Sequence, residues 1–256
     1  MQMVLEKILN RYNSISLAEM DSVKLMNRID SKFIFSINDL HDILLNLEND
    51  YSILNLNNKL THSYESLYFD DENDRFFKDH HRGKKNRFKV RYRQYIDSKK
   101  SYLEVKHKKN GRTFKRRVLS SIENDDLSVK QMKFVRENSI SSIDLKKSIS
   151  TSYQRITLVS LIPPERITFD ISLSFSKNGN TIKMSDIAIA ELKQNKIDRS
   201  SPFYKLMKKR GERSIKLSKY ILGRIALKGK EKLKYNRFKI TLLQLNKIRK
   251  NEYHLV

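Results

Sequence analysis

Polar and apolar residues alternate along several segments of the chain, which is the pattern of β-strands with two unlike faces. The clearest segment is NRFKVRYRQY, residues 86–95. Its alternation places Arg87, Lys89, Arg91 and Arg93 on one face and Phe88, Val90 and Tyr92 on the other. Cations at intervals of roughly 7 Å repel one another, so we expect an anion to bind on that face.

Similar alternation, with β-branched and aromatic residues, predicts the other strands. The predicted strands cover residues 24–36, 63–71, 86–96, 100–109, 112–120, 150–160, 166–176 and 185–194. Asn110-Gly111 and Asn178-Gly179 are typical of tight turns between strands, and Pro163-Pro164 interrupts the chain between two others.

Apolar residues spaced three and four apart predict the helices. We expect helices over 2–10, 16–23, 37–48, 201–210 and 214–227, two more within 124–148, and a short helix or loop over 73–86. Strands without hydrophobic inner faces favour an α+β fold, a closed antiparallel β-barrel with a polar, basic interior and flanking helices. The expected organisation is N-terminal helices over 1–23, the barrel over 24–227, and a basic C-terminal helix or tail over 228–256.

Composition narrows the choice of partner. The 256 residues include 53 Lys and Arg against 29 Asp and Glu, a net charge of +24, which attracts polyanions in general. The chain has no cysteine, which excludes disulfides and thiolate metal sites.

The N-terminal residues lack the apolar core of a secretory signal, and no segment reaches the roughly 18 apolar residues of a membrane span. We expect a cytoplasmic protein and leave open an association with the inner face of the membrane.

Several other predicted strands repeat the cationic alternation. On one strand, a solvated face is the simpler explanation. Across many strands the polar faces are strongly cationic, with the isolated carboxylates Asp30, Glu104, Asp170 and Glu191. Cations that face one another inside a barrel are destabilising unless an anion binds there, and arginine can hold two phosphate oxygens at once. Because Mg²⁺ takes one or two carboxylates plus phosphate oxygens, the pattern predicts a phosphate-rich ligand with a divalent cation.

The order of these motifs resembles that of the VTC domain. The motifs are RIDSKF, YESLYFDD, NRFKVRYRQY, SYLEVKHKK, FKRRV, SYQR, RITFD, AELKQ and IKLSKYILG, between about residues 24 and 225. This is the polyphosphate polymerase domain of the vacuolar transporter chaperone complex and its stand-alone bacterial relatives. It belongs to the triphosphate tunnel metalloenzymes, alongside the CYTH-type triphosphatases. The resemblance implies a tunnel-shaped antiparallel barrel that transfers the γ-phosphate of ATP to a growing polyphosphate chain.

The resemblance also implies particular site residues. The implied catalytic residues are Lys32, Arg91, Arg93 and Glu191, and the implied phosphate-binding residues are Lys106, Lys115, Tyr153, Arg155, Arg166, Ser218 and Lys219. Glu191 matches the family's metal ligand, for Mn²⁺ or Mg²⁺. The implied partners are ATP and polyphosphate, and a membrane protein partner stays open. No nucleic acid is expected, since the chain has no RNA-binding signature and Tyr92 and Tyr95 are not arranged as a stacking platform.

The first motif departs from the hydrolytic tunnel enzymes, which carry Glu-x-Glu-x-Lys where this chain has Arg28-x-Asp30-x-Lys32. With one carboxylate fewer, a second metal that activates water has less support, which favours transfer to phosphate over hydrolysis. VTC-like domains usually carry Arg-x-Glu-x-Lys, so Asp30 is one methylene short. Two alternatives remain: a triphosphatase on the same fold, and a polyphosphate- or nucleic-acid-binding module without catalysis.

Overall fold

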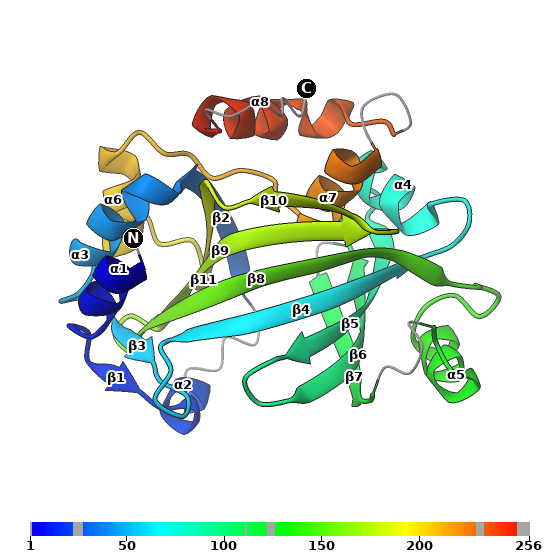
Figure 1. Ribbon diagram of the computed structural model, residues 1–256, viewed down its shortest axis with the longest axis horizontal. Coiled ribbons are helices and arrows are strands. Elements are labelled where there is room, and N and C mark those ends of the chain that lie inside the picture. The colour runs from blue at the N-terminus through cyan, green and yellow to red at the C-terminus, as the bar shows by residue number, and fades with distance from the viewer. Residues whose placement is uncertain (1, 23–27, 111, 122–125, 229–232, 250–256) are drawn as a thin grey trace.

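The computed structural model describes residues 2–22, 28–110, 112–121, 126–228 and 233–249, and an eleven-stranded sheet forms the body of this part of the chain (Figure 1). Eight strands follow one another in the order β2-β11-β9-β8-β4-β5-β6-β7, with antiparallel neighbours throughout. Their bounds are Ile29–Ser36, Ile187–Gln194, Glu165–Lys177, Lys146–Ser160, Thr61–Asp70, Asn86–Tyr95, Lys100–Lys109 and Arg112–Leu119.

Three short strands lie off this path. β10 (Asn180–Met184) pairs with β9, and β3 (Ser52–Leu54) pairs with β8 and with β1 (Ser14–Ile15). Asn178 and Gly179 connect β9 to β10 with φ of 49° and 80°, the positive values that a tight hairpin turn requires. The predicted Asn178-Gly179 turn is therefore confirmed, whereas Gly111 lies outside the described residues.

Helices flank the sheet. Their bounds are Gln2–Leu9 (α1), Leu17–Ser22 (α2), Leu40–Leu45 (α3), Arg75–Arg82 (α4), Val129–Asn138 (α5), Pro202–Lys209 (α6), Lys219–Lys228 (α7) and Lys239–Ile248 (α8), with 3₁₀ turns at Ile37–Asp39 (η1) and Asn236–Phe238 (η2). Side chains cap several of them: Ser128 and Gln131 form a capping box at α5, and Ser201 precedes Pro202 at α6. Of the helices described, none is both long and apolar enough to cross a lipid bilayer.

The predicted barrel is confirmed only as a curved antiparallel sheet with flanking helices. The hydrogen-bonded path ends at β2 and β7, and in the described ranges no backbone pairing joins these two strands. The sheet is nevertheless curved, since Lys32 of β2 and Lys89 of β5 donate hydrogen bonds to the adjacent residues Leu217 and Ser218. Closure by hydrogen bonds is therefore not confirmed.

Hydrophobic clusters lie on both sides of the sheet. On the outer face of β2, β11, β9 and β8, a cluster that includes Phe35, Phe169 and Ile156 packs against α1, α3 and α6. On the outer face of β4, β5 and β6, Val90, Leu103 and other residues pack against Val135 of α5. These two clusters leave the inner face free for polar side chains along most of its length.

Helix α7 fills one end of the inner face. Its residues Tyr220, Ile221 and Ile225 join a cluster with Ile149 of β8 and Phe175 of β9. The buried carboxylate of Asp70 connects three elements: it accepts the Phe76 and Phe77 N–H groups of α4 at 2.8 and 2.9 Å and the Tyr220 hydroxyl at 2.5 Å. These bonds fix the beginning of α7 relative to β4, which places Ser218 and Lys219 at the sheet.

Most predicted elements are present, and the differences have local causes. The segment 124–148, expected to hold two helices, holds α5 alone in its described part, because β8 begins at Lys146 to pair with the end of β4. The helix expected from residue 214 begins at Lys219. The preceding segment is extended, and its Ile215 N–H donates to the Lys32 carbonyl of β2 at 2.7 Å.

Candidate functional site

The inner face of the sheet carries charged rows on neighbouring strands. On β5, the residues Arg87, Lys89, Arg91 and Arg93 share this face, and the β5–β6 register sets Lys108, Lys106, Glu104 and Tyr102 beside them. The β6–β7 register then sets Lys115 beside Lys106 and Arg117 beside Glu104. The alternation read from the sequence therefore becomes a continuous cationic surface across three strands.

Glu104 forms the first of three ion clusters on this face. Its side chain is 2% exposed and accepts Arg91 Nε at 2.8 Å and Nη2 at 2.7 Å, with Lys115 as a further partner. Burial opposes ionisation of Glu104, but the charges of Arg91, Arg93 and Lys115 outweigh it and lower the pKa to about 2. Glu104 therefore stays ionised and orients Arg91 across the face.

Asp170 of β9 forms the second cluster. Arg155 of β8 donates to its two oxygens at 2.6 and 2.8 Å, and Lys219 at the start of α7 is a second cation on the same carboxylate. Burial disfavours the carboxylate, yet Arg155 and Lys219 hold the pKa of Asp170 well below its usual range. The bidentate geometry fixes the guanidinium plane of Arg155.

Tyrosine rings pack beside this second cluster. The rings of Tyr64 and Tyr153 stack with centroids 5.4 Å apart, and Arg93 Nη2 donates to the Tyr153 hydroxyl at 2.9 Å. Lys219 Nζ lies 4.7 Å from the Tyr153 centroid and Arg155 Cζ 5.2 Å from that of Tyr64. The ring faces therefore attract these neighbouring cations through cation–π contacts and offset part of the repulsion between them.

Glu191 of β11 forms the third cluster. Lys193 Nζ lies 2.7 Å from one of its oxygens and Lys32 Nζ lies 3.6 Å from the other. Burial raises the pKa of Glu191, and the charges of Lys193 and Lys32 more than offset this, so the net pKa is well below its usual range. The Glu191 side chain is 19% exposed, compared with 1–2% for Asp170 and Glu104. It is the most accessible of these three carboxylates.

The extended segment that precedes α7 lies between β2 and β5. Lys32 Nζ donates to the Leu217 carbonyl at 3.1 Å, and Lys89 Nζ of β5 donates to the Ser218 hydroxyl at 2.8 Å. Burial, together with Lys32 and Lys106, lowers the pKa of Lys89 well below its usual value. The segment therefore connects the two sides of the curved sheet, and Ser218 meets Lys89 at this point.

The structure brings together ten of the eleven residues expected from the sequence. Lys32, Arg91, Arg93, Lys106, Lys115, Tyr153, Arg155, Glu191, Ser218 and Lys219 all belong to these clusters or act on them electrostatically. Arg166 lies on the same face, in register with Lys193, but its Nη1 contacts the sulfur of Met20 in α2 at 3.8 Å.

The sequence analysis gave no role in the site to Lys89, Tyr64 or Lys193. Lys89 precedes Arg91 by two positions, so the strand period already placed it on the inner face. Lys193 shares a face with Glu191 in the same way. Tyr64 gave no such signal, because its stacking on Tyr153 depends on the pairing of β4 with β8.

The donor set limits which metal these residues could hold. In the described ranges, no three His, Asp or Glu side chains converge into a metal-binding group. Glu191 offers a hard carboxylate oxygen on an accessible part of the face. This fits Mg²⁺ or Mn²⁺ with one protein carboxylate, the remaining ligands being phosphate oxygens and water.

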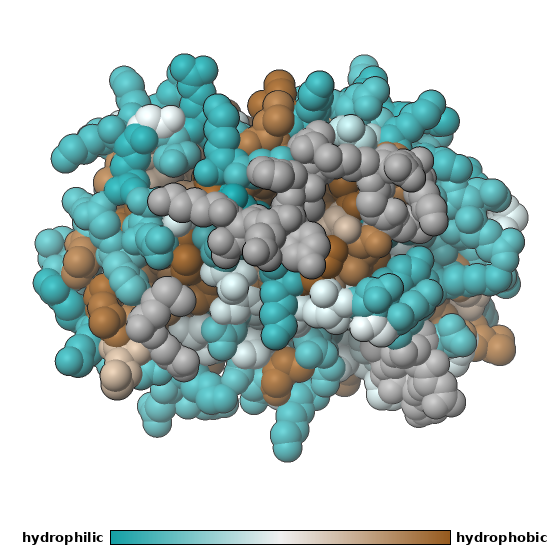
Figure 2. Space-filling view, turned by 45° about the horizontal axis from the view of Figure 1, so that its top comes forward, coloured by the Kyte–Doolittle hydropathy of each residue, from teal (hydrophilic) through white to brown (hydrophobic). Residues whose placement is uncertain are grey.

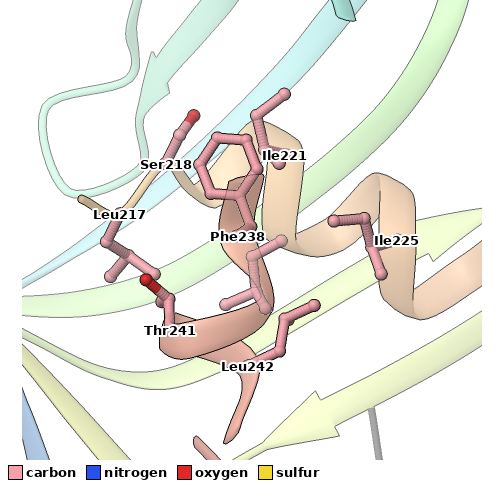
Figure 3. A pocket seen from close by; sticks show the side chains of 8 residues that line it. Leu217, Ser218, Ile221, Ile225, Phe238, Thr241 and Leu242 are labelled. Carbon is pink, nitrogen blue, oxygen red and sulfur yellow. The ribbon is translucent and has the colours of Figure 1, made fainter. Parts of the chain in front are cut away.

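A small apolar pocket lies next to this face but differs from it chemically. It is lined by Leu217, Ser218, Ile221, Leu222, Ile225, Phe238, Thr241 and Leu242, between α7 and the η2–α8 segment (Figure 3). Its lining has no charged side chain.

Hydrophilic side chains project over most of the coloured surface in Figure 2, with smaller hydrophobic areas between them.

Two solved structures are similar to this chain. A candidate adenylate cyclase from Bacillus halodurans has a TM-score of 0.51 and 15% identity, covering 77% of this chain and 98% of that one. A candidate adenylyl cyclase from Hippeastrum, described as having a dominant triphosphatase activity, has a TM-score of 0.47 and 13% identity, covering 77% and 95%. The first of these shows similarity of fold.

The sequence itself identifies the family. The sequence-family model described as the VTC domain matches residues 27–228, most of the chain. The protein therefore belongs to the VTC domain family, and the resemblance in motif order is confirmed. No curated protein sequence matches the chain significantly.

Proposed function

We propose that the protein is a metal-dependent polyphosphate polymerase, an ATP:polyphosphate phosphotransferase. Membership of the VTC domain family supports an enzyme that acts on phosphate compounds. In the proposed reaction, a terminal oxygen of the polyphosphate chain attacks the γ-phosphorus of ATP. The bond from that phosphorus to the bridging oxygen breaks, and ADP leaves with the electron pair.

One observation carries the proposal: Glu104, Asp170 and Glu191 are each already held by two cations, and further cations remain around them. Glu104 binds Arg91 and Lys115, and Asp170 binds Arg155 and Lys219. Each cluster therefore has more positive than negative charge. Such clusters are costly without a bound anion, and a chain of phosphates could neutralise several of them at once.

The fixed guanidinium groups suit phosphoryl transfer, which requires alignment and charge neutralisation more than covalent help. Glu104 orients Arg91, and Tyr153 orients Arg93 through its hydroxyl. Asp170 holds Arg155 in a bidentate pair. These donors would bind oxygens of the transferring phosphoryl group without reorganising during the reaction. The acceptor phosphate is ionised near neutral pH, so no general base is needed.

Glu191 is the residue that we propose to hold the metal, with Lys32 and Lys193 as its neighbours. A bound Mg²⁺ or Mn²⁺ would neutralise charge on phosphate oxygens and ease the departure of ADP. Burial lowers the pKa of Lys193 to about 8, although the charge of Glu191 partly offsets this.

Incubation with ATP and Mn²⁺, followed by gel separation of the products, tests the proposal. We expect a ladder of long polyphosphate. Release of inorganic phosphate without a ladder would instead identify a triphosphatase, and unchanged ATP would identify a binding module. Either of these two results contradicts the polymerase proposal.

A further inference from the structure

An aromatic cluster lies on the inner face at the end where β5 turns into β6. It consists of Tyr95, Tyr102 and Arg117, on β5, β6 and β7. The rings of Tyr95 and Tyr102 meet edge-to-face, with centroids 5.9 Å apart, and Arg117 Cζ lies 4.8 Å from the Tyr102 centroid. Tyr64 meets Tyr95 at 5.1 Å and connects this cluster to the buried Tyr153.

The cluster is accessible, unlike the tyrosines deeper in the sheet. Tyr95 and Tyr102 are half-buried and Arg117 is exposed, whereas Tyr153 is 3% exposed. Leu119, the β7 partner of Tyr102 in the register, is 66% exposed. An aromatic ring, a guanidinium plane and an exposed aliphatic side chain therefore lie side by side, and these groups stack on or pack against a flat heteroaromatic ring.

The cluster is also next to the cations proposed to bind phosphate. Arg93 is the register partner of Tyr102 and precedes Tyr95 by two residues. From Tyr95 to Arg91 the strand covers roughly 13 Å. A nucleoside triphosphate in extended form is of comparable length, so a base near Tyr95 and Tyr102 would direct its phosphates towards Arg93 and Arg91.

We propose that Tyr95, Tyr102 and Arg117 form a nucleobase-binding site that lets the protein bind a nucleoside triphosphate more tightly than an inorganic triphosphate. This inference rests on the proposed function for the placement of the phosphates. Stacking on aromatic or arginine planes tolerates different bases, since every base presents a π-face. The site thus selects for the presence of a base, with only weak preference among bases.

The test compares the Kd values of ATP and tripolyphosphate, measured calorimetrically without added divalent metal so that neither ligand is turned over. Tyr102→Ala removes the ring without changing the charge, and Arg117→Ala removes the exposed guanidinium. Tyr102→Phe keeps the ring. Arg116→Ala is the matched control for charge, because Arg116 is the adjacent exposed residue on the opposite face of β7.

We expect Tyr102→Ala and Arg117→Ala to weaken ATP binding by roughly 5- to 100-fold, the range that loss of one stacked base produces. Their losses for tripolyphosphate should be much smaller, and Tyr102→Phe and Arg116→Ala should retain the wild-type preference for ATP. Equal losses for both ligands, or wild-type protein that binds tripolyphosphate as tightly as ATP, would overturn the inference. Because binding is measured without turnover, this result is independent of whether polyphosphate is made.

Discussion

At the scale of single residues, the inner face is organised by three carboxylates, Glu104, Asp170 and Glu191, that each bind two cations. A buried ion pair gains little stability over apolar residues of similar size, but removal of one partner leaves a costly unpaired charge. Glu104, Asp170 and Glu191 are thus better understood as residues that orient arginine and lysine than as sources of stability. Because these carboxylates orient cations, neutralising one of them should change the stability or the turnover of the protein.

Replacement of Glu104 by Gln is expected to change how stability depends on pH. The folded-state pKa of about 2 is below the ordinary value of 4.5, so the ionised form stabilises the folded protein above about pH 4.5. That contribution, on the order of 3 kcal/mol at most, is lost as pH falls from 4.5 to 2. In urea titrations, the difference in unfolding free energy between wild type and Glu104→Gln should shrink over this window. A difference that stays constant with pH would contradict the ion cluster.

Replacement of Glu191 by Gln is expected to abolish metal-dependent turnover while weak ATP binding remains. The amide keeps the shape of the side chain but removes the charge that would bind the metal. Turnover and ATP affinity are measured separately, with Glu65→Gln as the control, because Glu65 is an exposed glutamate on β4. Turnover close to wild type in Glu191→Gln would show that the metal is held elsewhere.

At the scale of elements, α7 couples the core to the site. It packs its apolar side into one end of the curved sheet, and its first residue, Lys219, contacts Asp170 and the Tyr153 ring. The position of Lys219 therefore depends on the packing of α7. Gly223 is the residue that allows the helix to approach β8 and β9 so closely.

Replacement of Gly223 by Ala should destabilise the protein by about 1–3 kcal/mol through overpacking, although alanine is the better helix former. An added Cβ would lie 2.8 Å from Ile149 Cδ1 and closer still to the Phe175 ring. Denaturant unfolding measures the loss. Combining Gly223→Ala with Phe175→Leu should give less than the sum of the two separate losses, and strict additivity would contradict the proposed contact.

The sequence predicted elements with strong periodicity better than it predicted their connections. The alternation in β5, β6 and β7 gave their positions closely, because side chains on a strand must alternate. β1, β3 and β10 were not predicted, since two to five residues carry too little pattern. The late start of α7 could not be predicted, because residues 214–218 form part of an apolar pattern but extend along β2 instead.

The sequence predicted which cations belong to the candidate site, but it did not predict which residues those cations contact. Period two placed Arg91 and Arg93 on one face, but the bond from Arg93 to Tyr153 joins residues 60 positions apart. The meeting of Tyr95 with Tyr102 likewise depends on the turn between β5 and β6. Closure of the barrel by hydrogen bonds was expected and is not confirmed, since polar alternation alone does not specify which strands are edges.

At the scale of the whole molecule, a net charge of +24 opposes the compact state through self-repulsion. An anion that binds only the folded protein should relieve this repulsion and stabilise the fold. At 100 times its Kd, a single bound ligand contributes about 2.7 kcal/mol. For a chain of this size, the expected rise in Tm is roughly 5–10 °C.

Thermal unfolding with tripolyphosphate tests this expectation, with sodium chloride of equal ionic strength and orthophosphate as controls. Tripolyphosphate should raise Tm in a concentration-dependent manner and by more than either control, since it can reach several cation clusters at once. A Tm that responds equally to all three salts would indicate general screening of the surface charge and contradict a specific phosphate site.

The fate of the γ-phosphate tests the central claim most directly. The protein is incubated with Mn²⁺ and ATP labelled with ³²P at either the γ or the α position, and the products are separated on a gel. The γ-label is expected to enter a ladder of long polyphosphate while the α-label stays in ADP. Appearance of the γ-label only in orthophosphate would show hydrolysis, and would contradict transfer to a growing polyphosphate chain.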